Sequence, residues 1–178
     1  ISLEVDLPQY ADLTPATIRK LKRLLAIIAQ AAPFKPNFTQ IAGQLKVSRN
    51  NIADLCAWLE KAGLIGQLRD STGGIQGLGK VDKVYLDNTT LIYVLGNENT
   101  EIRTIRETFF FNQMRAEYDI TSSPISDFLI ADKYTFEVGG KKKKQKQIQD
   151  AAQGYVVKDD IETGYGNIIP LWQFGLTY

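Results

Sequence analysis

The sequence predicts an α+β protein, within the broader α/β class, that is built from two successive modules. In the first, apolar residues recur at helical spacing from about residue 14 to residue 61, and two β-like segments follow. In the second, a long amphipathic segment over residues 101–118 precedes two short apolar runs around residues 126–138. Each module therefore combines helices with a β-hairpin.

The bulk composition is that of an ordinary globular chain. Of the 178 residues, 44% are hydrophobic and 23% are charged, which permits a sizeable core without a disulfide or a metal. The net charge is +1, so any nucleic-acid contact must come from local clustering of charge. No apolar run is long enough to span a bilayer, and no membrane partner is expected.

The absence of His and the presence of a single Cys narrow the kinds of catalytic and metal site that the chain can form. The chain has no His, which excludes Ser-His-Asp triads, Cys-His dyads and His-based zinc sites. Cys56 is the only cysteine, so an internal disulfide is impossible, and a reducing cytoplasmic setting is expected.

Residues 14–87 show the element order of a winged helix-turn-helix. Thr14 and Pro15 are typical of a helix start, and Ser48 of a helix cap. The expected elements are a helix from Thr14 to the prolines at 33 and 36, a helix over 39–45, a helix from Ser48 to Gly63, and strands at 64–69 and 80–87. Helix, helix, turn, helix and β-hairpin is the winged-helix order, in which the third helix enters the major groove of DNA.

This order predicts a set of DNA contacts. Early positions of the third helix suit guanine and adenine edges, and basic residues on or beside the wing suit phosphates. The expected nucleic-acid-binding residues are Arg49, Asn50, Asn51, Arg69, Lys80 and Lys83. Winged helices also serve as protein-interaction modules, so that alternative stays open.

The glycine-rich loop between the two expected strands matches most of a phosphate-binding loop. Gly74, Gly79 and Lys80 fit the pattern G-x-x-x-x-G-K-S/T. However, Val81 stands where the magnesium-binding hydroxyl should be, and the following segment is β-like rather than helical. We therefore expect no nucleotide binding here and interpret the glycines as the tip of the wing.

The second module, residues 88–178, is expected to carry further helices and strands. Its long helix should place Ile102, Ile105, Phe109 and Met114 on or near one apolar stripe. The other expected elements are a short helix closed by Gly96, a hairpin over 126–138, a basic helix over 142–152, a strand over 154–160 and an apolar closing segment from 167.

Helix, β-hairpin, helix and strand is the core order of the PD-(D/E)XK nuclease fold. Asp127 and Glu137 occupy the carboxylate positions on the two hairpin strands, and strand alternation predicts that they share a face. Two such carboxylates supply the hard oxygen ligands that Mg²⁺ prefers. A lysine two residues after the second acid would stabilise the attacking hydroxide, but that position is Gly139.

Several longer motifs together resemble a bacterial AAA-type ATPase family. They are "EKAGLIGQL", "KVYLDNTTLIYVL", "RETFFFNQM", "DFLIADKYTFEVGGKKKKQKQI" and "DIETGYGNIIPLWQFGLTY". In that family a P-loop domain precedes a winged helix and a degenerate nuclease-like domain of the DUF4143 type, and the last motif is similar to the Bacteroidetes subgroup. The resemblance implies that residues 1–13 are the exit from a missing ATPase domain, which would hold any ATP.

The chain departs from the family's nuclease pattern. Ser126 replaces an acid that the family carries before Asp127, and Gly139 replaces its lysine. The resemblance makes Glu107, on the long helix, a third acid that converges with the other two on a metal, and Lys141 a substitute for the lost lysine.

Three functions remain open at this stage. The first is a non-catalytic DNA- or partner-binding region of a cytoplasmic P-loop ATPase, whose partners are its own ATPase domain and another protein or DNA. The second is a Mg²⁺-dependent nuclease, with Asp127, Glu137 and Lys141 as candidate catalytic residues. The third is a protein-interaction or dimerisation module. The missing lysine argues against the enzyme.

Overall fold

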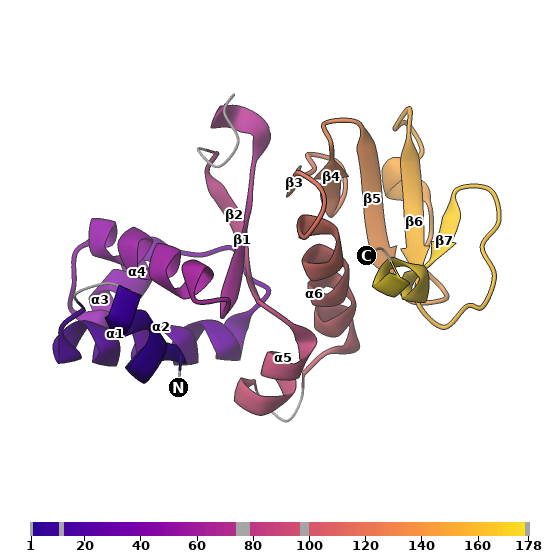
Figure 1. The fold of residues 1–178 in the computed structure, drawn as a ribbon. Coiled ribbons are helices and arrows are strands. Elements are labelled where there is room, and N and C mark those ends of the chain that lie inside the picture. Colours follow the sequence, from indigo (N-terminus) through magenta and orange to yellow (C-terminus); the bar gives the residue numbers. More distant parts are fainter. Residues whose placement is uncertain (1, 11–12, 74–78, 97–99, 177–178) are drawn as a thin grey trace.

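The computed structural model describes residues 2–10, 13–73, 79–96 and 100–176, and it has an α+β fold (Figure 1). The helices are α1 (Leu7–Tyr10), α2 (Pro15–Ala31), α3 (Phe38–Leu45), α4 (Arg49–Lys61), α5 (Thr89–Leu95) and α6 (Ile102–Arg115). The strands are β1 (Ile65–Arg69), β2 (Val81–Leu86), β3 (Ile120–Ser122), β4 (Phe128–Ile130), β5 (Tyr134–Gly139), β6 (Gly154–Lys158) and β7 (Ile168–Pro170).

The helices of the first module begin where the sequence places their caps. The Thr14 hydroxyl accepts a hydrogen bond from the Thr17 amide at 3.2 Å, and the Ser48 hydroxyl accepts one from the Asn51 amide at the same distance. Asn37 caps α3 in the same way. These side chains satisfy amides at helix starts that have no partner within the helix. The expected order of three helices and an antiparallel hairpin is present.

The three helices enclose a core of aliphatic side chains. Its buried members include Leu21, Leu24, Ile28, Ile41, Ile52, Leu55 and Leu59. Leu3 and Leu7 from the N-terminal segment pack into the same core. Cys56 is also buried here, and burial raises the pKa of its thiol to about 12, so it behaves as a small apolar side chain.

The wing hairpin, β1 and β2, is buried on both of its faces. Val84 and Leu86 contribute to the three-helix core, whereas Leu68 and Tyr85 contribute to a second core under α6. The Tyr85 ring stacks on Phe111 with centroids 4.5 Å apart. The wing hairpin is therefore shared between the cores of the two modules.

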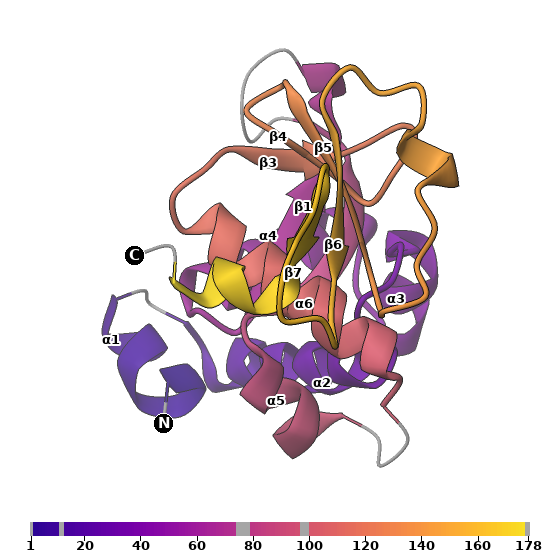
Figure 2. The same cartoon turned by 90° about the vertical axis from the view of Figure 1, so that its right-hand side faces the viewer.

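A single mixed sheet joins the modules. Its strand order is β2-β1-β3-β4-β5-β6-β7, with β1 parallel to β3 through one residue pair and β5, β6 and β7 parallel to one another. Helix α6 packs against this sheet through Phe110, Phe111 and Met114 (Figures 1 and 2). The closing 3₁₀ segment Leu171–Leu176 packs beside α6, as the view in Figure 2 shows.

Two details of the second module differ from the sequence-based prediction. The buried residues of α6 include Glu107, Thr108, Phe110 and Phe111, whereas Ile102 is 53% exposed, so the predicted stripe is rotated. Residues 142–152 form no α-helix but turns and a 3₁₀ segment, Lys146–Ile148. Only Ile148 is buried there, and the lysines and glutamines lack the apolar stripe that packing would need.

Among the described residues, no helix is both long and apolar enough to cross a membrane.

Candidate functional site

Three acids from three elements are buried near one another, and we call Glu107, Asp127 and Glu137 the carboxylate cluster. Glu107 comes from α6, Asp127 directly precedes β4, and Glu137 lies in β5. Their exposed fractions are 2%, 8% and 1%. Buried carboxylates are unfavourable unless they are paired or hydrogen-bonded, so their partners decide what this site can do.

Glu107 is paired with two cations. Its Oε1 accepts from the Arg103 guanidinium at 2.6 Å, and its Oε2 from the Lys83 ammonium at 3.2 Å. Arg103 is one helical turn before Glu107, a local i,i+4 pair. Lys83 reaches across from β2, so this contact also fastens the wing to α6.

The Asp127 side chain accepts a hydrogen bond from the backbone of β5, next to the last backbone pairs of β4 and β5. Its Oδ2 accepts a hydrogen bond from the Val138 amide at 2.9 Å, and its Oδ1 lies 3.8 Å from the cationic nitrogens of Lys83 and Arg103. Burial, with the nearby charges of Glu107 and Glu137, raises the pKa of Asp127 to about 6. Asp127 is therefore the acid of the cluster whose negative charge is least neutralised by nearby cations.

Glu137 is held by different partners. Its Oε2 accepts from the Ser126 hydroxyl at 2.8 Å, and its Oε1 is paired with the Lys143 ammonium. It pairs across β5–β6 with Val156, which belongs to a small core with Ile148 rather than to the core under α6. Glu137 and Glu107 therefore approach Asp127 from different sides of the sheet.

Lys143, not Lys141, supplies the lysine at this site. A Cβ placed on Gly139 would lie 2.7–2.9 Å from the Lys143 side chain, so that side chain occupies the space of the lysine that the nuclease pattern expects. Lys141 is exposed and makes no contact with the cluster. The missing helix over 142–152 explains the difference, because a turn after Gly140 points a different lysine inward.

The cluster is balanced in charge. Three carboxylates face Lys83, Arg103 and Lys143, each of which lies within 4 Å of at least one of them. In the part of the chain that the structure describes, no group of three or more acids, His or Cys is arranged to hold a metal ion. The residues that would hold Mg²⁺ are thus near one another but are engaged by internal cations.

Tyr85 is a buried polar residue that the sequence reasoning did not identify. Its side chain is fully buried, and its hydroxyl lies beside the Glu107 carboxylate without a hydrogen bond of normal geometry to a described residue. Burial, followed by the charges of Glu107 and Asp127, raises its pKa well above the usual value. Tyr85 thus remains a neutral hydroxyl beside the cluster. Lys83, Arg103, Ser126 and Lys143 were likewise missed as cluster members, because they are brought in from distant segments.

The expected DNA-contact residues lie in three different environments. Arg49, Asn50 and Asn51 are exposed on the first turn of α4, where Asn51 also interacts with the cap Ser48. Lys80 is exposed at the tip of the wing.

Arg69 is partly buried, and its guanidinium donates to the Gly79 carbonyl at 3.3 Å. Lys83 does not face outward, because Glu107 and Asp127 hold its ammonium. The expectation that Lys83 contacts phosphate therefore does not match its position.

The segment that is similar to a phosphate loop is described only in part. Gly74 lies outside the described residues. Lys80 directly precedes β2, so the chain continues as a strand where a phosphate loop would open a helix. Gly79 packs closely on the Asp70 backbone, which an added Cβ would meet.

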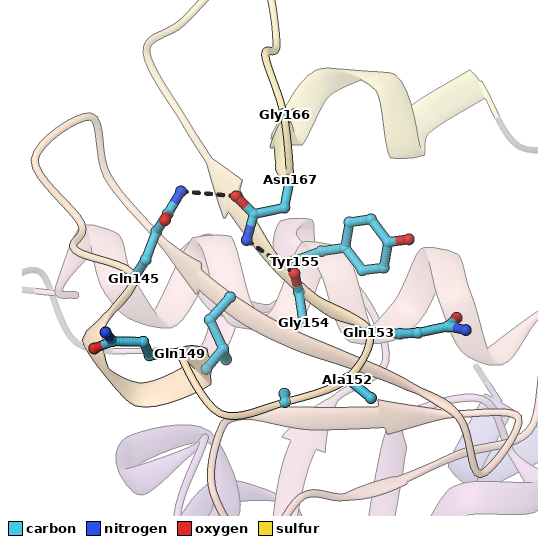
Figure 3. Close-up of a pocket in the computed structure, with 10 residues that line it drawn as sticks. Gln145, Gln149, Ala152, Gln153, Gly154, Tyr155, Gly166 and Asn167 are labelled. Atoms are coloured by element: carbon cyan, nitrogen blue, oxygen red, sulfur yellow. Dashed lines mark hydrogen bonds between the residues drawn. The ribbon is translucent and has the colours of Figure 1, made fainter.

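A separate pocket lies between the segment 145–153, the start of β6, and Gly166 and Asn167 in the loop before β7 (Figure 3). Amides dominate its lining: Gln145 donates to the Asn167 side chain at 2.7 Å, and Asn167 donates to the Gly154 carbonyl at 3.0 Å. No carboxylate or cation lines it. Its neutral, mutually satisfied amides offer no acid, base or nucleophile.

Comparison with protein families gives one match, to a family described as "Domain of unknown function (DUF8612)", over residues 2–101. The chain belongs to this family. The match covers the N-terminal segment, the three helices and hairpin of the first module, and α5, and it includes Lys83 but ends before the three acids of the cluster. Comparisons with the curated proteins and with solved structures give no match.

Proposed function

We propose that this DUF8612 chain is a non-catalytic DNA-binding region, in which the first turn of α4 contacts duplex DNA and the carboxylate cluster is structural. One observation carries the proposal. Residues 14–61 contain eight Lys or Arg and two Asp or Glu, a net charge of +6, whereas the whole chain has +1. Local clustering of this kind is what a duplex attracts.

The groups at the start of α4 suit base edges. Arg49 and Asn50 are exposed, and neither forms an ion pair or a hydrogen bond through its side chain with another described residue. Arg pairs with guanine and Asn with adenine in the major groove. Lys80, at the wing tip, is positioned to meet a neighbouring phosphate.

The pairing of every acid in the cluster supports a structural role for it. Lys83 joins β2 to α6, and Lys143 joins the loop after β5 to Glu137. The cluster then fixes the wing and the hairpin relative to each other. A metal ion would have to displace at least one of these internal cations.

The resemblance to AAA-type ATPases extends the proposal to the whole protein. On that basis the region would follow a cytoplasmic P-loop ATPase domain, with DNA binding coupled to ATP hydrolysis in that domain. The N-terminal segment with Leu3 and Leu7 packed on the winged helix gives such a domain a firm attachment.

Fluorescence anisotropy with short labelled duplexes tests the function. We expect weak, salt-sensitive binding, and Arg49→Ala should change the preference between sequences by roughly 1–3 kcal/mol. Lys80→Glu should weaken binding to all sequences alike. Lys83→Met is not expected to act as a phosphate-contact variant, because its ammonium is internal. An absence of binding at low salt would favour the protein-interaction module instead.

A Mg²⁺-dependent nuclease is the second candidate, and one observation favours it. The Lys143 side chain fills the space above Gly139, so an acid and a lysine remain adjacent at the position of the nuclease pattern. Glu107, Asp127 and Glu137 are the groups that would hold Mg²⁺. Incubation of plasmid and single-stranded DNA with Mg²⁺ or Mn²⁺ decides between the two: cleavage that is lost in both Glu137→Gln and Lys143→Met would replace the non-catalytic proposal.

A further inference from the structure

The first module carries a set of exposed cations that the DNA-contact prediction did not include. We call these residues, together with Arg49, the basic strip. Its members lie on α2, on the turn between α3 and α4, and at the start of α4: Arg19, Lys20, Arg23, Lys46 and Arg49. All five side chains are exposed. None of them forms an ion pair with another residue that the structure describes.

The strip is continuous across the helix-turn-helix. The Arg23 guanidinium lies 3.5 Å from the Gln44 carbonyl, in the last turn of α3. Lys46 follows as the left-handed cap of α3, with φ of 53°, and Arg49 opens α4. Arg19 is one turn before Arg23 on the same side of α2. The cations therefore run from α2 over the turn to the recognition position.

Three other cations of the module are paired with acids. Lys22 is paired with Glu4, Lys35 with Asp82 at 2.8 Å, and Lys83 with Glu107 at 3.2 Å. The five cations of the strip differ from these three because no described acid is paired with them, a property they share with Lys61, Arg69 and Lys80 elsewhere in the module. Arg19 and Arg23 are also like charges at i,i+4, which disfavours the helix unless an anion lies between them.

The chemistry of the strip fits a phosphate backbone. A membrane-binding surface would combine cations with exposed apolar side chains. Within residues 13–61, which are all described, no large hydrophobic side chain is exposed. Exposed amides, Gln44 and Asn50, lie in the same segments as the cations, and amides hydrogen-bond to phosphate and sugar oxygens.

We propose that the basic strip is a second contact for duplex DNA, which binds the phosphates beside the groove that α4 enters. This inference rests on the proposed function, and it adds Arg19, Lys20, Arg23 and Lys46 as backbone contacts. The contact is independent of sequence. It adds phosphate contacts that β1 and β2 do not offer, because both strands are packed between two cores.

The test compares two triple charge reversals in the full 178-residue chain. The strip variant is Arg19→Glu, Lys20→Glu and Arg23→Glu. The control is Lys133→Glu, Lys142→Glu and Lys144→Glu, which changes the net charge equally at exposed positions of the second module. Circular dichroism melts establish that both variants fold. The affinity for a labelled 20-base-pair duplex is then measured by anisotropy over a range of salt concentrations.

We expect the strip variant to lose at least tenfold in affinity at low salt. Its slope of log K against log salt should become less negative by about 2–3, because each lost phosphate contact contributes about 0.9. The control should lose less than threefold. Equal losses of affinity in both variants, or no loss in the strip variant, would refute the proposal that the basic strip contacts phosphates. The function proposed for α4 would still stand. If the unmodified chain binds no duplex at low salt, both proposals fail.

Discussion

Replacing Lys83 by Met removes the cation that joins the wing to the carboxylate cluster. Its ammonium lies 3.2 Å from Glu107 and 3.8 Å from Asp127, and its side chain is 27% exposed. At an effective dielectric constant of about 20, the attraction to Glu107 alone is roughly 5 kcal/mol before the desolvation of the lysine is subtracted. Arg103 still neutralises part of the charge, so we expect a net loss of about 2–4 kcal/mol in the free energy of unfolding.

Urea denaturation followed by fluorescence measures this loss. Lys35→Met is the matched control, because Lys35 is paired with Asp82 but its side chain is 70% exposed, so its loss should be much smaller than that of Lys83→Met. In the Lys83→Met background, Glu107→Gln should cost much less than in the unmodified chain. Equal losses for Lys83→Met and Lys35→Met would refute the view that the cluster fastens the wing.

Three further predictions concern stability. The pKa of Asp127 in the folded protein, about 6, is above its value in the unfolded chain. The stability that Asp127 contributes is therefore present below about pH 4 and is lost as the pH rises through 6. Urea titrations at pH 4 and pH 7 should show that Asp127→Asn removes roughly 2 kcal/mol of this pH dependence. Tyr85→Phe removes an unpaired buried hydroxyl and should leave the melting temperature unchanged or raise it, and a large decrease would mean that the hydroxyl is bonded. Gly66→Ala should cost more than about 2 kcal/mol because its Cβ would meet Phe111 at 2.5 Å, whereas Gly43→Ala, with nothing within 4 Å, should be neutral or stabilising.

The sequence predicted the first module well because its signals are local. Thr14 and Ser48 each cap a helix by bonding an amide three residues along. The apolar spacing of the helices matches their buried faces, and the hairpin follows at its expected place. Such features depend on neighbouring residues and need no knowledge of the rest of the fold.

The second module was predicted less completely because its buried face is set by tertiary contacts. The resemblance placed Glu107 with the other two acids, but the apolar stripe predicted for α6 did not include its position, and its partners Arg103 and Lys83 were not predicted. Lys143 comes from a loop that was expected to be helical. The pairing of Lys83 with an acid 24 residues away, and the sharing of the wing between two cores, have no local signal.

The salt dependence of DNA binding by the unmodified chain tests the central claim most directly. Anisotropy titrations of one labelled duplex at several salt concentrations give the slope of log K against log salt. If α4, the wing tip and the basic strip contact phosphates, the slope should be about −3 to −5, since each phosphate contact contributes about 0.9. An undetectable affinity at low salt, or a slope near zero, would contradict the account and leave a protein-interaction module in its place.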